Sequence, residues 1–167
     1  MIKRRDTYNV DVGGVKMNIF DSDDAKLAYT EMANRLGPRA LLMEMVPAGV
    51  EVSFGAIYDK GFGMVVIVSA GGVLIELLND KVAALAPFNS ELAKDLLNEM
   101  SVSRLLSGYR GRPAADIDGL ALQLARFSRM VALLGNAISE IDINPMTCGP
   151  DGAFAVDFLL VPKANYR

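Results

Sequence analysis

Two carboxylates and an amide near the end of the chain have the types and spacing of a metal site. Asp142 and Asn144 alternate with isoleucines in the run 140–145, and Asp157 follows inside the apolar run 154–158. Alternate side chains of a strand share one face, so two neighbouring strands could gather all three. An all-oxygen set suits Mg²⁺, which usually takes further ligands from water and nucleotide phosphates. A hairpin with polar residues on a solvated face is the alternative.

Three other groups of charged residues could take part in binding. Glu44 and Glu51 lie in otherwise apolar stretches, where a carboxylate can accept two hydroxyl donors or simply face solvent. Glu76 interrupts an apolar run, and it should be paired, metal-linked or exposed because a buried unpaired carboxylate is costly. Arg110 and Arg112 lie in a loop flanked by glycine and proline. Their guanidinium groups suit phosphate or carboxylate, or ordinary ion pairs with the aspartates that follow.

Composition excludes several classes of function. Seventeen basic and twenty acidic residues give a net charge of −3, which offers no electrostatic case for binding nucleic acid or an anionic membrane. The apolar run 64–68 is far shorter than the ~20 residues of a membrane-spanning helix, and residues 1–6 do not begin a secretory signal.

Histidine and cysteine usage narrows the chemistry further. The chain has no histidine, which excludes Ser–His and Cys–His nucleophile pairs and histidine metal sites. The single cysteine, Cys148, excludes an internal disulfide, and we expect a cytoplasmic protein.

The elements that must position these residues follow from apolar periodicity. Alternation and turn residues predict strands at 13–20, 41–46, 50–58, 63–69, 73–78 and 82–86. Three helices are expected, capped by Ser22, by Asn89 or Ser90, and by Asp116 or Asp118. The third is the longest, with an apolar stripe at Leu120, Leu124, Phe127, Val131 and Leu134. This order predicts an α+β fold with largely antiparallel sheets and packed helices.

Five segments, in this order, resemble the ATP-grasp family. The closest resemblance is to the β part of ADP-forming acyl-CoA synthetases, and the succinyl-CoA synthetase β subunit is more distant. The segments are 11–15 (DVGGV), 43–51 (MEMVPAGVE), 71–76 (GGVLIE), 106–113 (LSGYRGRP) and 140–145 (EIDINP) with Asp157. The resemblance implies a single ATP-grasp-like domain over 1–167, truncated at the N-terminus. About 1–47 would be a remnant of the smaller lobe, and about 48–167 the main lobe with the final hairpin.

The family's reaction joins a carboxylic acid to the thiol of CoA, coupled to interconversion of ATP with ADP and phosphate. By resemblance, Glu44 and Val46 would hold the adenine edge, Glu51 the ribose hydroxyls, and Asn144 and Asp157 a Mg²⁺ ion. The resemblance assigns no catalytic residue. We therefore expect a component of an acid–thiol ligase that binds Mg²⁺ with ATP or ADP. It would work as a homo-oligomer or with a CoA-binding partner subunit.

Some positions depart from the family pattern. The segment that normally precedes Asp11, with its phosphate-binding lysine, is missing; Tyr8 stands in place of a histidine, and Ala84 in place of an arginine. Each departure is expected to remove positive charge from the phosphate site, and phosphoryl transfer depends on such charge. The alternative is a degenerate, non-catalytic ATP-grasp domain with a structural or assembly role. A second copy or a partner would then cover the sheet edge near 10–20.

Overall fold

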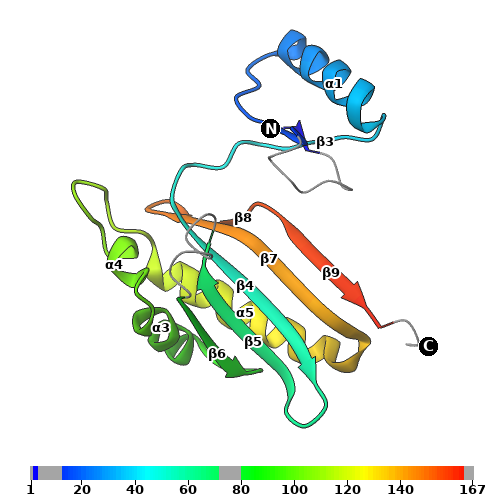
Figure 1. The fold of residues 1–167 in the computed structure, drawn as a ribbon. Coiled ribbons are helices and arrows are strands. Elements are labelled where there is room, and N and C mark those ends of the chain that lie inside the picture. Colours follow the sequence, from blue (N-terminus) through cyan, green and yellow to red (C-terminus); the bar gives the residue numbers. More distant parts are fainter. Residues whose placement is uncertain (1, 4–12, 72–79, 164–167) are drawn as a thin grey trace. The chain divides into compact units, whose positions relative to one another are not determined.

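The computed structural model describes residues 2–3, 13–71 and 80–163 (Figure 1). The chain divides into two compact units, Met1–Val46 and Pro47–Arg167. Within the described ranges, none of the helices has both the length and the apolar character needed to cross a bilayer.

The first unit combines one helix with very short strands. It contains a three-stranded antiparallel sheet, order β2-β1-β3, formed by β1 (Ile2–Lys3), β2 (Val15–Lys16) and β3 (Leu41–Leu42). The strands predicted over 13–20 and 41–46 are therefore too long. After β2 the backbone of Asn18 has a φ of 59°, a left-handed conformation that extended strands do not contain.

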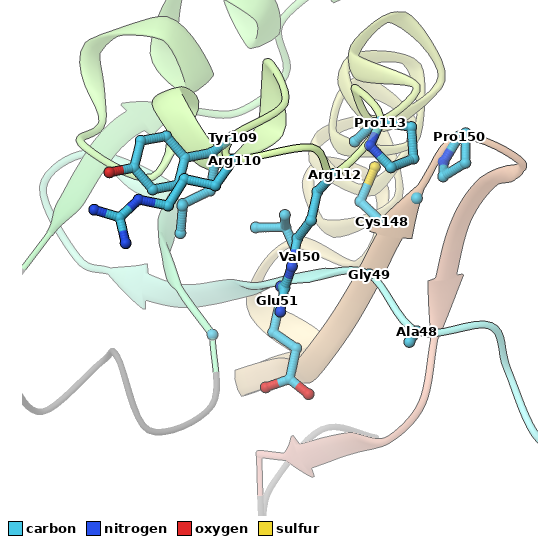
Figure 2. A pocket seen from close by; sticks show the side chains of 14 residues that line it. Ala48, Gly49, Val50, Glu51, Tyr109, Arg110, Arg112, Pro113, Cys148 and Pro150 are labelled. Atoms are coloured by element: carbon cyan, nitrogen blue, oxygen red, sulfur yellow. The ribbon is translucent and has the colours of Figure 1, made fainter.

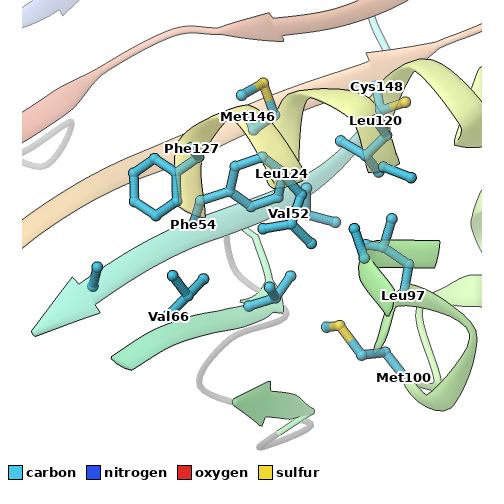
Figure 3. Packing of buried hydrophobic residues seen from close by; sticks show 14 of the residues in the cluster. Val52, Phe54, Val66, Leu97, Met100, Leu120, Leu124, Phe127, Met146 and Cys148 are labelled. Carbon is cyan, nitrogen blue, oxygen red and sulfur yellow. The ribbon is translucent and has the colours of Figure 1, made fainter. Parts of the chain in front are cut away.

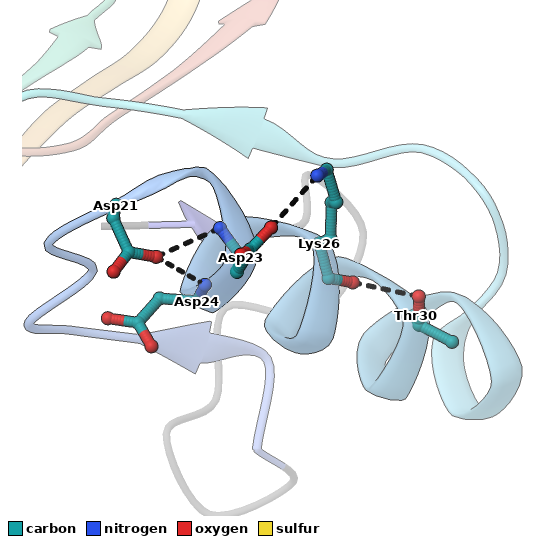
Figure 4. Close-up of polar contacts among 5 residues, drawn as sticks. All are labelled: Asp21, Asp23, Asp24, Lys26 and Thr30. Atoms are coloured by element: carbon teal, nitrogen blue, oxygen red, sulfur yellow. Dashed lines mark hydrogen bonds and ion pairs between the residues drawn. The ribbon is translucent and has the colours of Figure 1, made fainter.

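Helix α1 (Ser22–Leu36) begins at Ser22, the residue predicted as its cap, and the cap itself lies one residue earlier. Asp21 is the N-cap: its Oδ1 accepts hydrogen bonds from the backbone N–H groups of Asp23 at 2.9 Å and Asp24 at 2.8 Å (Figure 4). Asp21 has the extended backbone that is typical of an N-cap, and Ser22 is the first residue of the helix. The helix ends at Gly37, whose φ is 93°.

The second unit is built on a six-stranded antiparallel sheet, order β6-β5-β4-β7-β8, with β9 also paired to β7. Its strands are β4 (Val50–Asp59), β5 (Gly63–Ala70), β6 (Lys81–Leu85), β7 (Ile138–Gly149), β8 (Gly152–Ala155) and β9 (Phe158–Pro162). β8 and β9 pair with successive halves of one edge of β7. The strand predicted over 73–78, with Glu76, lies outside the described residues.

Two helices of this unit, α3 (Ser90–Glu99) and α5 (Ile117–Leu134), have the N-caps that the sequence predicts. Helix α4 (Ser103–Leu106) lies between them in the chain, and the short 3-10 helix η2 (Gly135–Ala137) follows α5. Asn89 accepts a hydrogen bond from the N–H of Leu92 at 3.0 Å, and Asp116 accepts one from the N–H of Gly119 at 2.8 Å. The prediction of an α+β fold with antiparallel sheets and packed helices is confirmed.

Helices α3 and α5 cover one face of the sheet, here called the inner face (Figures 1 and 3). Val52, Phe54 and Ala56 of β4 are buried against them, and the ring of Phe54 lies 5.9 Å from that of Phe127 on α5, between centroids. Burying each large side chain stabilises the fold by roughly 1.5–3 kcal/mol. The opposite face is called the outer face and carries Ser53, Gly55, Ser69, Lys81 and Asp142.

Candidate functional site

The side chain of Asp142 lies on the outer face. Asp142 is directly opposite Gly55 of β4 and Leu159 of β9, and residues opposite each other in a ladder share a face. A Cβ atom at Gly55 would lie 3.6 Å from Asp142 Oδ1, so the carboxylate lies over this glycine. Burial raises the pKa of Asp142, and the charges of Glu140 and Asp157 raise it further. The three carboxylates therefore share a negative field, which favours a cation nearby.

Asn144 lies in a β-bulge of β7. Asn144 and Pro145 together oppose the single residue Ser53 of β4, which is the two-against-one count of a bulge. The other edge of β7 is interrupted at the same point, because Val156 and Asp157 lie between β8 and β9. The N–H of Asn144 donates to the carbonyl of Asp157 at 3.2 Å, and the N–H of Val156 to that of Pro145 at 3.0 Å. Asp157 was predicted inside a strand, and the structure corrects this to a break between two strands.

The donors at this bulge are of the type that a hard cation prefers. Asn144 is exposed and Asp157 is half-buried, with Oδ1 accepting a hydrogen bond from the N–H of Phe158 at 2.9 Å. Across the part of the chain that the structure describes, no three acidic or cysteine side chains gather to hold a metal by themselves. An amide and a carboxylate instead suit Mg²⁺ with water and phosphate oxygens as its other ligands.

A further row of polar side chains crosses the outer face and was missed by the sequence reasoning. The hydroxyl groups of Ser53 and Ser69 form a hydrogen bond of 2.7 Å, and Ser69 is opposite Lys81 of β6. The predicted strand began one residue too late, so it left Lys81 out. Ala84 is opposite the fully buried Val66, on the inner face. A side chain at position 84 therefore projects from the inner face.

A pocket of about 830 Å³ lies at the end of the same sheet (Figure 2). It is lined by the start of β4, the end of β7 and the loop between α4 and α5, including Val50, Glu51, Cys148, Tyr109, Arg110 and Arg112. The structure thus brings Glu51 together with the two loop arginines, which the sequence reasoning treated separately. No local pattern could have shown this, because the lining comes from three distant segments.

The remaining predicted binding residues lie in the first unit. Glu44 is exposed and lines a pocket of about 900 Å³ together with Asn18, Phe20 and Met45. Val46 is half-buried and ends this unit. Residues 8, 11 and 76, named in the sequence analysis, lie outside the described residues.

Comparison with known proteins identifies the family. Residues 3–161 match the model of the ATP-grasp domain. The chain is 35% identical to acetate–CoA ligase [ADP-forming] I of Archaeoglobus fulgidus over 92% of its own length, but this spans only 23% of that protein. It is 33% identical to acetate–CoA ligase [ADP-forming] I subunit beta of Pyrococcus furiosus, covering 92% of this chain and 69% of the subunit.

A solved structure supports the same assignment. Dinucleotide-forming acetyl-coenzyme A synthetase 1 of Ca. Korarchaeum cryptofilum, in complex with coenzyme A and Mg-AMPPCP, aligns with a TM-score of 0.83 and 30% identity. The alignment covers 97% of this chain and 76% of that one. The antiparallel sheet with its packed helices is thus an ATP-grasp fold. The chain belongs to the ATP-grasp domain family and is related to ADP-forming acyl-CoA synthetases.

Proposed function

We propose that this chain binds ATP or ADP with Mg²⁺ as the ATP-grasp component of an ADP-forming acyl-CoA synthetase. The observation that carries the proposal is the bulge at Asn144, where a main-chain hydrogen bond of 3.2 Å holds Asn144 beside Asp157. Asn144 and Asp157 would hold the metal, Glu51 the ribose hydroxyls, and Glu44 and Val46 the adenine edge. A related synthetase was solved in complex with coenzyme A and Mg-AMPPCP, which supports the binding of a nucleotide with Mg²⁺.

The residues at the bulge and on the outer face fit this role chemically. Asn144 and Asp157 offer oxygen donors, and bound Mg²⁺ would neutralise charge on the nucleotide phosphates. Lys81 projects from the outer face and adds a positive charge beside the Ser53–Ser69 pair.

The full ligation reaction would need parts beyond this chain. We assign the first unit to a remnant of the smaller ATP-grasp lobe and the second unit to the main lobe. A CoA-binding subunit or domain would supply the thiol and the site that activates the acid. The partial coverage of the Archaeoglobus fulgidus ligase, 23% of its length, supports this division of labour.

Calorimetric titration with ADP tests the proposal, in Mg²⁺ and in EDTA. We expect Mg²⁺ to strengthen ADP binding, and the double variant Asn144→Ala/Asp157→Ala to lose that gain while staying folded. The variant Asn98→Ala/Asp95→Ala is the matched control, since it makes the same two changes on exposed positions of α3. If Mg²⁺ leaves ADP affinity unchanged in the folded chain, or if both double variants behave alike, the proposal is wrong.

A structural or assembly role is the second candidate, and strand β9 favours it. Phe158, Leu159 and Leu160 on this edge strand are 65%, 46% and 40% exposed. Exposed apolar edge strands favour pairing with another chain. Light scattering would support this role if the chain is a dimer that Phe158→Lys converts to a monomer. A monomer at high concentration would count against it.

A further inference from the structure

The loop between α4 and α5 is held in place at its C-terminal end and folded by an internal turn. The N–H of Ala115 donates to the carbonyl of Leu106 at 2.8 Å, and the N–H of Asp116 donates to the carbonyl of Gly149 at 2.9 Å. Between them, the N–H of Arg112 donates to the carbonyl of Tyr109 at 3.1 Å. These bonds tie the loop to α4, to β7 and to itself, so it presents its side chains in a defined arrangement.

The backbone of this loop turns sharply around its two arginines. Gly108, Arg110 and Gly111 have φ values of 91°, 49° and 82°. A left-handed conformation is unfavourable for arginine, so the surrounding structure must hold Arg110 there. Arg110 also places its guanidinium 5.3 Å from the centre of the Tyr109 ring.

The two guanidinium groups border the pocket at the end of the sheet. Arg112 extends from the loop in the direction of Val50 and Glu51, and Arg110 lies beside the Tyr109 ring (Figure 2). Among the described residues, neither arginine forms an ion pair with a carboxylate. Among the described residues that line this pocket, Glu51 is the only acidic one, and it is accompanied by the two arginines.

We propose that this pocket binds the phosphate group of a small ligand, with Arg112 as the main contact and Arg110 as the second. The volume of about 830 Å³ falls in the range of small-molecule sites. Guanidinium groups match phosphate with two parallel hydrogen bonds, and a phosphate monoester carries about −1.5 to −2 charge at neutral pH. The contact needs no metal ion and does not use Asn144 or Asp157. It goes beyond the proposed function, since it assigns the loop arginines a ligand.

Calorimetry in EDTA tests this site with inorganic phosphate, ribose 5-phosphate, ADP and acetate as separate probes. We expect saturable binding of at least one phosphorylated probe, and weaker binding of acetate. Binding of ADP alone would identify a nucleotide's own phosphate as the source. Comparable binding of ribose 5-phosphate or phosphate would identify a separate phosphorylated ligand. If none of the three binds, or if acetate binds more tightly, the proposal is overturned.

Variants locate the binding in the pocket. Arg112→Met should weaken binding about tenfold or more, because it removes a charge-assisted hydrogen-bonding group. Arg112→Lys should retain part of the affinity, since it keeps the charge and loses the planar fork. Arg104→Met is the matched control: it removes the same charge from an exposed position on α4 outside the pocket.

Two outcomes of these variants would refute the site. Equal affinity of Arg112→Met and the unaltered chain would remove Arg112 as a contact. Equal losses of affinity in Arg104→Met and Arg112→Met would show that the effect comes from the net charge of the chain and not from a contact in the pocket. These titrations contain EDTA and depend on Arg112, whereas the magnesium titrations depend on Mg²⁺, so failure of the magnesium proposal and failure of this one give different results.

Discussion

The two faces of the six-stranded sheet differ in what their side chains do. On the inner face Val52, Phe54 and Val66 are fully buried beneath α3 and α5. On the outer face Ile57 is 44% exposed and Leu85 is 53% exposed, and the same face carries the polar residues Ser53, Ser69 and Lys81. The same strands supply both faces, so their alternation separates the residues that stabilise the fold from those that can bind a ligand.

This separation means that the outer face can change without loss of the fold. Ser53, Lys81 and Asp142 are not part of the hydrophobic core cluster. A substitution there should alter binding or charge, and a substitution on the inner face should alter stability. Four experiments test this contrast, from the largest expected effect to the smallest.

Truncating Phe54 tests the inner face. Phe54→Ala removes a fully buried ring that packs against Phe127, and we expect a loss of about 3–5 kcal/mol in the free energy of unfolding. Ile57→Ala, on the same strand but on the outer face, should cost less than about 1 kcal/mol. Chemical denaturation measures both. Similar losses in the two variants would show that the faces contribute equally to stability.

Cys148 provides a chemical probe of the inner face. Burial raises the pKa of Cys148 to about 11, from an ordinary value of 9.0, and the charge of Asp116 adds to the effect. The thiolate fraction at neutral pH is then ~100-fold lower, so the native thiol should react slowly with a disulfide reagent. Its rate should rise with pH toward about 11 and increase sharply in denaturant. An exposed thiol in a Ser107→Cys/Cys148→Ser variant is the control, and equal rates would contradict the burial.

The cap of α5 tests how firmly the helix covers the inner face. Asp116→Ala removes the acceptor for the N–H of Gly119, and we expect a loss of about 1 kcal/mol in the free energy of unfolding. Asp118→Ala changes an exposed residue in the first turn of the helix, where it removes only a solvent-exposed ion pair with Lys94 at 2.6 Å, and it should cost less. Denaturation midpoints of the two variants compare them directly. Equal costs would mean that the cap adds nothing beyond a general acidic charge at the helix start.

Lys81 tests the outer face. Lys81→Met should weaken Mg-ADP binding by about threefold, since it removes one exposed charge whose effect is screened by salt. The free energy of unfolding should stay within about 0.5 kcal/mol of that of the unaltered chain. Lys60→Met, in the turn between β4 and β5, is the control. Lys81 has no role in binding if the two variants bind ADP equally.

The inner face could be predicted from the sequence because its signals are local. The apolar stripe of the longest helix contains Leu120, Leu124 and Phe127, and all three are buried. The alternation of 50–58 likewise predicted β4. Periodicity works here because each residue contacts the core through its own strand or helix.

The outer face was harder to predict because its geometry depends on interruptions. Alternation assumes an unbroken ladder, but Asn144 and Pro145 form a bulge, and Asp157 lies in a break of the neighbouring edge. Pro145 was the available signal, since proline lacks the N–H that a central strand needs. The roles of Asn144 and Asp157 as metal ligands stay a prediction. The pocket beside Glu51 could not be predicted, because its segments meet only in the folded chain.

The hydrogen bond from the N–H of Asp116 to the carbonyl of Gly149 has a consequence for how the pocket could be observed. Asp116 both caps α5 and ends the loop that carries Arg112. The same hydrogen bond therefore holds the start of this helix and the loop that lines the pocket. A ligand that steadies the loop should therefore slow amide hydrogen exchange at Asp116 and Gly119. These two amides would report pocket occupancy from a helix that the ligand does not touch.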